Sequence, residues 1–167
     1  MLNAGQGILN DMNNEEWTHR LAIHEAGHAI SCFLNGVGFD FVKIMPHRRT
    51  KRCGLTKARI ATDTTSPTKT HRDLLILLAG YCAECIKFGN GFKEGTIRDV
   101  EKAYCRALGV TSSEKECSQF MRDARDNTEK LLNNNWKFVE RLADKLIEKH
   151  YITGSEVIEI ITNETII

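Results

Sequence analysis

The sequence contains no long hydrophobic run. Its longest apolar stretch, Leu74 to Gly80, is far shorter than the roughly 20 residues that a helix needs to cross a bilayer. The N-terminus has no basic segment followed by an apolar one, which excludes a secretory signal peptide. No G-x-x-x-x-G-K-S/T phosphate-binding loop occurs, so the sequence has no means of using ATP. We therefore expect a cytoplasmic chain without a membrane segment or an ATPase of its own.

Charge and cysteine content exclude further classes of protein. The net charge is only +1, which argues against a partner bound by overall electrostatic attraction. The six cysteines are scattered and lack the framework of a small secreted domain, so we expect a reducing compartment. Cys82 and Cys85 form one C-x-x-C without a second pair, and we expect them to pack in a helix rather than bind metal. A chain of 167 residues can bury its own core, and we expect one domain over residues 1–167.

Hydrophobic periodicity predicts a mainly α fold with a small β-hairpin. The strands are expected at 39–45 and 53–61, on either side of a polar turn. The expected helices run from about Asn13 to Leu34, from Thr70 to Phe88, from the segment around Asp99 to Leu108, and from Ser113 to Lys149. Asn133 to Asn135 is a possible break in the last of these helices. Thr70 and Asp73 have the spacing of a capping box and are expected to begin the second helix.

The first predicted helix contains the motif His24-Glu25-Ala26-Gly27-His28. Positions four apart lie on one face of a helix, so both imidazoles can reach a single Zn²⁺ at roughly 2.0 to 2.1 Å. Glu25 then stands beside the metal, where a carboxylate can take a proton from water. Gly27 costs about 1 kcal/mol relative to alanine in a helix interior, and we interpret it as a point of close backbone packing.

The alternative is that the motif consists of two surface histidines and a solvated carboxylate. Apolar residues enclose it in the sequence, namely Leu21, Ala22, Ile23, Ala29 and Ile30. Buried imidazoles and carboxylates need partners, and one metal ion would satisfy both rings. We therefore favour a metal site.

Two histidines leave a third protein ligand to be found. The pattern H-E-x-x-H-x-x-G-x-x-H does not occur, because Ser31 and Leu34 stand where glycine and histidine are required. A glutamate roughly 20 residues downstream is also excluded, since no acidic residue lies between Asp40 and Asp63. His47 is in a cationic turn that disfavours a dication, and we interpret it as a solvated loop residue.

Asp99 is the best remaining candidate for the third ligand. It lies near the start of a predicted helix, in the segment from Gly95 to Ala103. Thr96 and Asp99 also have capping-box spacing, so the aspartate has a purely structural alternative role. Spacing alone supports the two roles about equally.

Three blocks of the sequence resemble the peptidase domain of the FtsH-type ATP-dependent zinc metalloproteases. These blocks are His24 to Ala29, Leu77 to Glu84 and Thr96 to Ala103, and Ile152 to Val157 resembles the family's closing short helix. Their order and separations match along nearly the whole chain. The middle block departs from the family's Gly-Gly-Arg-Ala-Ala-Glu, with Ala79 for the first glycine and Tyr81-Cys82 for Arg-Ala. The family's membrane anchor and AAA ATPase have no counterpart in this sequence.

The resemblance implies a helical zincin-like peptidase domain. It implies that His24, His28 and Asp99 bind Zn²⁺ and that Glu25 is the general base. We predict a zinc metalloendopeptidase that works without ATP on polypeptides that are already extended or are delivered by a separate unfoldase ATPase. Glu84 is expected to accept a hydrogen bond from a liganding histidine, the alternative being a surface carboxylate. The rival functions are a catalytically silent zinc-binding interaction module and a basic nucleic-acid-binding protein.

The segment between Lys43 and Arg59 holds seven Lys or Arg residues and no acid. A solvated hairpin explains this composition, and so does a nucleic-acid contact. We expect no nucleic acid, because no aromatic residue is interleaved in the turn. The resemblance favours a hairpin edge that pairs with an extended substrate backbone. Arg48 and Arg49 in the turn would then select acidic peptide segments, which charge reversal at both positions would test.

Overall fold

The computed structural model describes residues 14–45, 54–60, 66–91 and 93–163. The helices are α2 (Asn14–Leu34), α3 (Pro67–Leu77), α4 (Ala79–Phe88), α5 (Lys93–Leu108), α6 (Glu114–Asn134), α7 (Trp136–Lys149) and α8 (Gly154–Thr162). The strands are β1 (Phe39–Ile44), β2 (Gly54–Ala58) and β3 (Tyr151–Thr153). The prediction of a mainly α fold with a small β-ribbon is confirmed.

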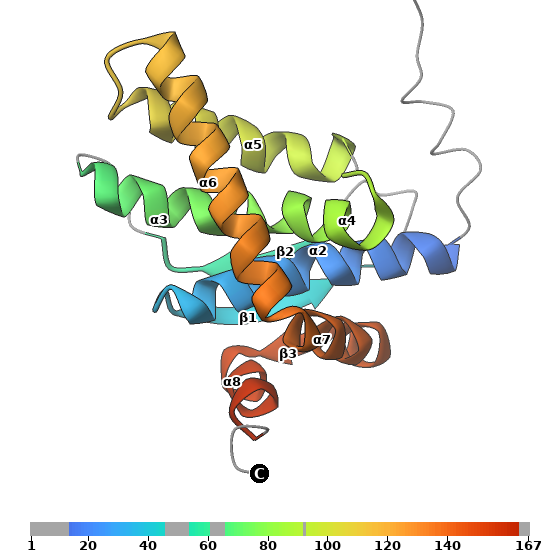
Figure 1. The fold of residues 1–167 in the computed structure, drawn as a ribbon. Coiled ribbons are helices and arrows are strands. Elements are labelled where there is room, and N and C mark those ends of the chain that lie inside the picture. The colour runs from blue at the N-terminus through green and yellow to red at the C-terminus, as the bar shows by residue number, and fades with distance from the viewer. Residues whose placement is uncertain (1–13, 46–53, 61–65, 92, 164–167) are drawn as a thin grey trace, which may run out of the picture.

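Helix α2 lies in the middle of the fold. In Figure 1, α3, α4 and α5 lie on one side of α2, and α7 and α8 lie on the other. Helix α6 crosses α3 and α4 and leads into α7, while β1 and β2 pack against α2. The HExxH motif is therefore held in the core and not on a solvated helix face. Among the described residues, no helix is long and apolar enough to span a membrane.

The sheet has three antiparallel strands in the order β2-β1-β3. The predicted hairpin is confirmed, with Val42 of β1 opposite Thr56 of β2. The third strand was not predicted, and it pairs Val42 with Ile152 on the other side of β1. Residues 152 and 153 were assigned to the closing helix, which is wrong. Helix α8 begins only at Gly154, after Thr153 forms a capping box with Glu156.

The helix predicted from Thr70 to Phe88 is in fact two helices, α3 and α4. The first begins at Pro67, which suits a first helical position because proline has no N–H to satisfy there. Thr70 is therefore inside α3 and fully buried, so the predicted capping box does not form. Backbone hydrogen bonds continue through the junction, from Leu78 N–H to the Leu74 carbonyl at 2.9 Å. The interruption at Leu78 thus leaves α4 directly following α3.

The long helical stretch after Ser113 is broken near the predicted position. Helix α6 ends at Asn134 and α7 begins at Trp136, with Asn135 between them at a non-helical φ of −122°. Apolar residues at helical spacing form a stripe along this stretch that lies in the core, and its fully buried members are Leu132, Val139, Leu142 and Leu146. This stripe packs the C-terminal half of the chain against α2.

Gly27 marks a close approach of α2 to α4, as predicted. A Cβ atom at this position would lie 2.7 Å from the Ala79 carbonyl oxygen and 2.8 Å from Ala83 Cβ. Only glycine fits such a contact without moving a backbone. Cys82 on the same helix α4 is fully buried in the core and Cys85 is half-buried, which confirms the predicted packing role for the first of the pair. Burial raises the pKa of the Cys82 thiol to about 12.

Candidate metal centre

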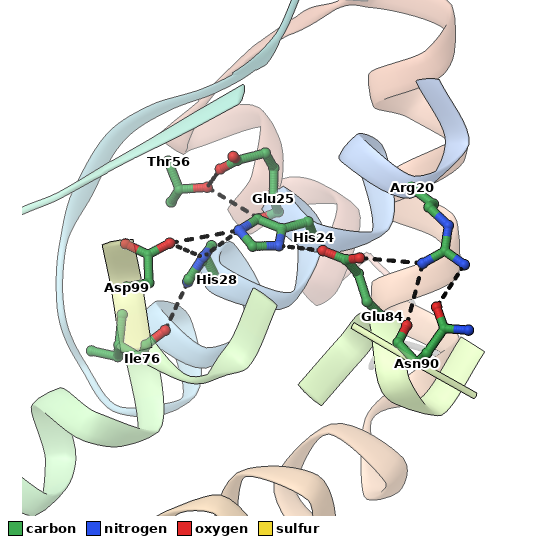
Figure 2. Close-up of polar contacts among 9 residues, drawn as sticks. All are labelled: Arg20, His24, Glu25, His28, Thr56, Ile76, Glu84, Asn90 and Asp99. Atoms are coloured by element: carbon green, nitrogen blue, oxygen red, sulfur yellow. Dashed lines mark hydrogen bonds and ion pairs between the residues drawn. The ribbon is translucent and has the colours of Figure 1, made fainter. Parts of the chain in front are cut away.

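His24 and His28 lie one turn apart on α2 and point toward the same place (Figure 2). Their Nε2 atoms are 3.0 Å from one another, and both residues are buried. The interpretation of these residues as solvated surface histidines is therefore wrong. Two imidazole nitrogens that converge inside a protein need a hydrogen-bond or metal partner.

Asp99 comes to the two rings from α5. Its Oδ2 is 3.4 Å from His28 Nε2 and 3.7 Å from His24 Nε2. A tetrahedral Zn²⁺ with bonds of roughly 2.0 to 2.1 Å separates its ligand atoms by about 3.3 Å. The three ligand atoms lie within 4.8 Å of one another, and they form the His/Cys/Asp/Glu group found among the described residues that could hold a metal ion.

The capping alternative for Asp99 does not fit the position of the helix end. Helix α5 begins at Lys93, so Thr96 and Asp99 lie inside the helix. Thr96 is buried, with 4% of its surface exposed. The second carboxylate oxygen of Asp99 lies 3.4 Å from Lys102 Nζ on the next turn. The aspartate side chain therefore extends from the middle of α5 toward the histidines.

Each histidine is held at its other ring nitrogen. His24 Nδ1 is 2.7 Å from Glu84 Oε1 on α4, and His28 Nδ1 is 2.7 Å from the Ile76 carbonyl oxygen on α3. Since both partners can only accept, each Nδ1–H donates, and Nε2 is the atom that faces the cluster. Glu84 is 2% exposed, so it is not a surface carboxylate. The expected hydrogen bond between Glu84 and a histidine of the motif is present.

Glu25 is buried beside this cluster and is held by β2. Thr56 Oγ1 donates to Glu25 Oε2 at 2.8 Å. A Cβ atom at Gly54 would lie 2.6 Å from Glu25 Cγ, so this glycine leaves space for the carboxylate. Neither Gly54 nor Thr56 was predicted as a site residue. A glycine inside a strand is a signal of close approach by another group, and it was available in the sequence.

Gly80 leaves space next to both ring nitrogens. A Cβ atom there would lie 2.6 Å from His24 Nε2 and 2.6 Å from His28 Nε2. Glycine at this point of α4 thus keeps open the space that faces the two nitrogens. The open space and the set of two imidazole nitrogens and one carboxylate oxygen together fit a Zn²⁺ ion.

The hydrogen bonds within the cluster shift the pKa values of His24 and Asp99. Burial lowers the pKa of His24, but hydrogen bonds with Asp99 and Glu84 outweigh burial and raise this pKa to about 10. Burial would raise the pKa of Asp99, but its hydrogen bonds with His24 and His28 hold that pKa well below its usual range. The raised pKa of His24 favours a protonated imidazole between the carboxylates of Asp99 and Glu84. A metal ion would replace the proton on Nε2.

Some predicted features lie outside the described residues. His47, Arg48 and Arg49 belong to the segment between β1 and β2 that the structure does not describe, and so does Cys53. The assignment of His47 to a solvated loop and the role of the cationic turn stay predictions.

Comparison with known proteins finds a distant relative. No protein-family model matches the chain. The chain is similar to the ATP-dependent zinc metalloprotease FtsH of Neorickettsia risticii (strain Illinois), with 26% identity over 84% of this chain. It spans only 27% of the length of that relative. The similarity suggests an FtsH-related region.

Proposed function

We propose that this chain is a zinc metalloendopeptidase that cleaves extended polypeptides. The observation that carries the proposal is the convergence of His24 Nε2, His28 Nε2 and Asp99 Oδ2 next to the buried carboxylate of Glu25. The similarity to a zinc metalloprotease supports the same chemistry.

His24, His28 and Asp99 would hold the metal through these three atoms. When bound in such a site, Zn²⁺ polarises a carbonyl group and lowers the pKa of water to about 7. The hydrogen bonds at the two Nδ1 atoms fix the ring orientation, so Nε2 of each histidine is directed at the ion. Three protein ligands leave a position for water or substrate.

Glu25 would act as the general base. It follows His24 directly in the sequence, and its carboxylate is oriented by the Thr56 hydroxyl. Glu25 accepts a proton from the attacking water and passes it to the leaving amine of the cleaved peptide bond. A carboxylate held in place by a hydrogen bond loses less orientational freedom in the reaction than a free one.

Strand β2 is the element that would bind the substrate. It is an edge strand, so its outer side has no strand partner among the described residues. An extended polypeptide can pair with such an edge by main-chain hydrogen bonds. Gly54 and Thr56 of this strand contact Glu25, which would bring a paired peptide close to the base. We propose that substrates are already extended or are handed over by a separate unfoldase ATPase.

Glu25→Gln tests the proposal. We expect the purified variant to retain zinc and to lose turnover of an unfolded protein substrate by roughly 10² to 10⁴ fold. Glu129→Gln is the control and should cleave like the wild type, because Glu129 is a half-buried residue of α6 that pairs with Arg125 at 2.9 Å. Zinc content is measured by atomic absorption and cleavage by peptide release. A zinc-loaded wild type that cleaves nothing would instead support the silent zinc-binding module.

A further inference from the structure

Arg20 meets the same carboxylate that holds His24. It lies one turn before His24 on α2, and its Nη1 atom forms an ion pair with Glu84 Oε2 at 3.4 Å. The other oxygen of Glu84 is the one that lies 2.7 Å from His24 Nδ1. Figure 2 shows the carboxylate between the guanidinium and the imidazole. Glu84 therefore bridges a cation and a candidate metal ligand.

The guanidinium is itself fixed by the residues that follow α4. Its Nη1 donates to the Asn90 carbonyl oxygen at 3.2 Å, and its Nη2 donates to Asn90 Oδ1 at 3.0 Å. The guanidinium carbon lies 4.3 Å from the ring centroid of Phe88. The side chain of Arg20 is only 12% exposed. Four contacts thus hold a planar group in one orientation, which lysine could not reproduce.

We propose that Arg20 is a positioning residue that sets the affinity of the site for Zn²⁺. It acts by fixing the plane of the Glu84 carboxylate so that Oε1 faces His24 Nδ1. A liganding histidine that donates to a well-placed carboxylate keeps its ring orientation and is a better ligand. The inference rests on the proposed metal site, and it assigns to Arg20 a role in metal binding without contact to the ion.

A purely structural role of Arg20 predicts a change in stability without a change in zinc affinity. Arg20 joins α2 to the end of α4, so its removal would lower the free energy of unfolding in either case. Only a positioning role also changes zinc affinity and the surroundings of the His24 ring. The decisive measurements are therefore made on folded protein and do not involve substrate.

The first experiment compares zinc affinity in the full chain by competition with a chromophoric chelator. We expect Arg20→Met to weaken binding about ten-fold. Lys87→Met is the matched control, because Lys87 is a cation on α4, the helix that carries Glu84, and it ties α4 to Glu140 of α7 at 2.6 Å. Its zinc affinity should stay within about two-fold of the wild type. Asn90→Ala, which removes one anchor of the guanidinium, should give a smaller loss than Arg20→Met.

The second experiment is a double-mutant cycle with Glu84→Gln. If Arg20 acts through Glu84, Arg20→Met should cause little further loss of affinity in the Glu84→Gln background. The ring ¹⁵N shifts of His24 in the zinc-loaded protein should change in Arg20→Met and stay unchanged in Lys87→Met. Arg20→Lys retains the cation and replaces the methionine variant if that one does not fold, with an expected loss of a few fold.

The inference is overturned if Arg20→Met binds zinc as the wild type does, or if its loss is equally large when Glu84 is glutamine. The same holds for Arg20→Lys if it is the variant tested. These outcomes are separate from the fate of the proposed peptidase. A protein with Arg20-dependent zinc affinity and no cleavage would refute the peptidase alone.

Discussion

Thr56 Oγ1 lies 2.8 Å from Oε2 of Glu25 and 3.1 Å from the main-chain oxygen of the same residue, although the two residues are 31 positions apart. The edge strand β2 thereby holds the carboxylate that follows the first histidine of the motif. This contact links the surface proposed to bind substrate to the group proposed to take the proton.

Thr56→Val should lower turnover without affecting metal binding. Valine has nearly the shape of threonine but cannot donate to Glu25, so the carboxylate loses the group that orients it. We expect kcat on an extended peptide to fall about ten-fold and zinc content to stay unchanged. Thr56→Ser keeps the hydroxyl and should retain most of the activity. Equal kcat values for the valine variant and the wild type would show that the contact does not matter to catalysis.

Gly80→Ala should abolish zinc binding. The added Cβ would lie 2.6 Å from both Nε2 atoms, in the space where the ion is expected. Gly38→Ala is the control, because its nearest neighbour would be Arg59 Cδ at an ordinary 3.7 Å. Zinc content after dialysis against a weak chelator distinguishes the two variants. Full metal occupancy in Gly80→Ala would mean that the metal does not bind between these nitrogens.

Gly27→Ala should destabilise the fold. Alanine is favoured over glycine in a helix by about 1 kcal/mol, but overpacking against α4 typically costs about 1 to 3 kcal/mol or more. The clash is with the Ala79 carbonyl oxygen at 2.7 Å, which is backbone and cannot swing aside. Because two contacts would be shorter than 3 Å, we place the overpacking cost in the upper part of that range and expect the free energy of unfolding in urea to fall by roughly 1 to 2 kcal/mol. A variant as stable as the wild type would show that α2 and α4 can separate at little cost.

The metal-free protein should lose stability at alkaline pH. The folded-state pKa of His24 is raised to about 10, above its unfolded value of about 6.5. The stabilisation is therefore fully present below about pH 6.5 and is lost as the pH rises through about 10. Urea unfolding of the metal-free wild type and of His24→Gln should show this fall in the wild type only. Parallel pH profiles would contradict the assignment of the proton to His24.

Zinc binding should become stronger as the pH rises, whereas the stability of the metal-free protein falls. Because the ion replaces the proton on His24, its apparent affinity should rise with pH over the same range. Asp99 gives the stability of the folded protein the opposite pH dependence, which appears at acid pH. Its pKa is lowered in the folded state, so its contribution is present above the unfolded value of about 3.9 and is lost as the pH falls. Isothermal titration calorimetry in buffers of different ionisation enthalpy measures the protons released on zinc binding.

The helix boundaries show the limit of local patterns. Thr70 with Asp73 and Thr96 with Asp99 both have capping-box spacing, yet both threonines are buried inside helices that begin about a turn earlier. The spacing of a threonine and an acidic residue does not reveal whether either side chain forms a tertiary contact instead of capping the helix. Asp73 is paired with Arg106 of α5 at 2.6 Å, a contact between distant segments. Tertiary contacts therefore outweighed the local preference.

The HExxH helix, the hairpin and the break before α7 were predictable because each follows from periodicity or turn residues within a short window. Strand β3 was not predictable, because it has only three residues and is defined by its pairing with β1. Gly27 was recognised as a close contact, although the partner α4 was unknown. The glycine in the sequence indicated that another segment packs closely against this helix, but it did not identify that segment.

Helical periodicity alone places His24 and His28 on one face with Glu25 beside them, since that arrangement depends only on 3.6 residues per turn. The sequence therefore carries the chemical character of the site in a single helix. The convergence of Asp99, Glu84 and Thr56 on that helix comes from the packing of α4 and β2 against α2 and of α5 against α3. Contacts between segments distant in the chain arise from burial and close packing, which no local preference encodes.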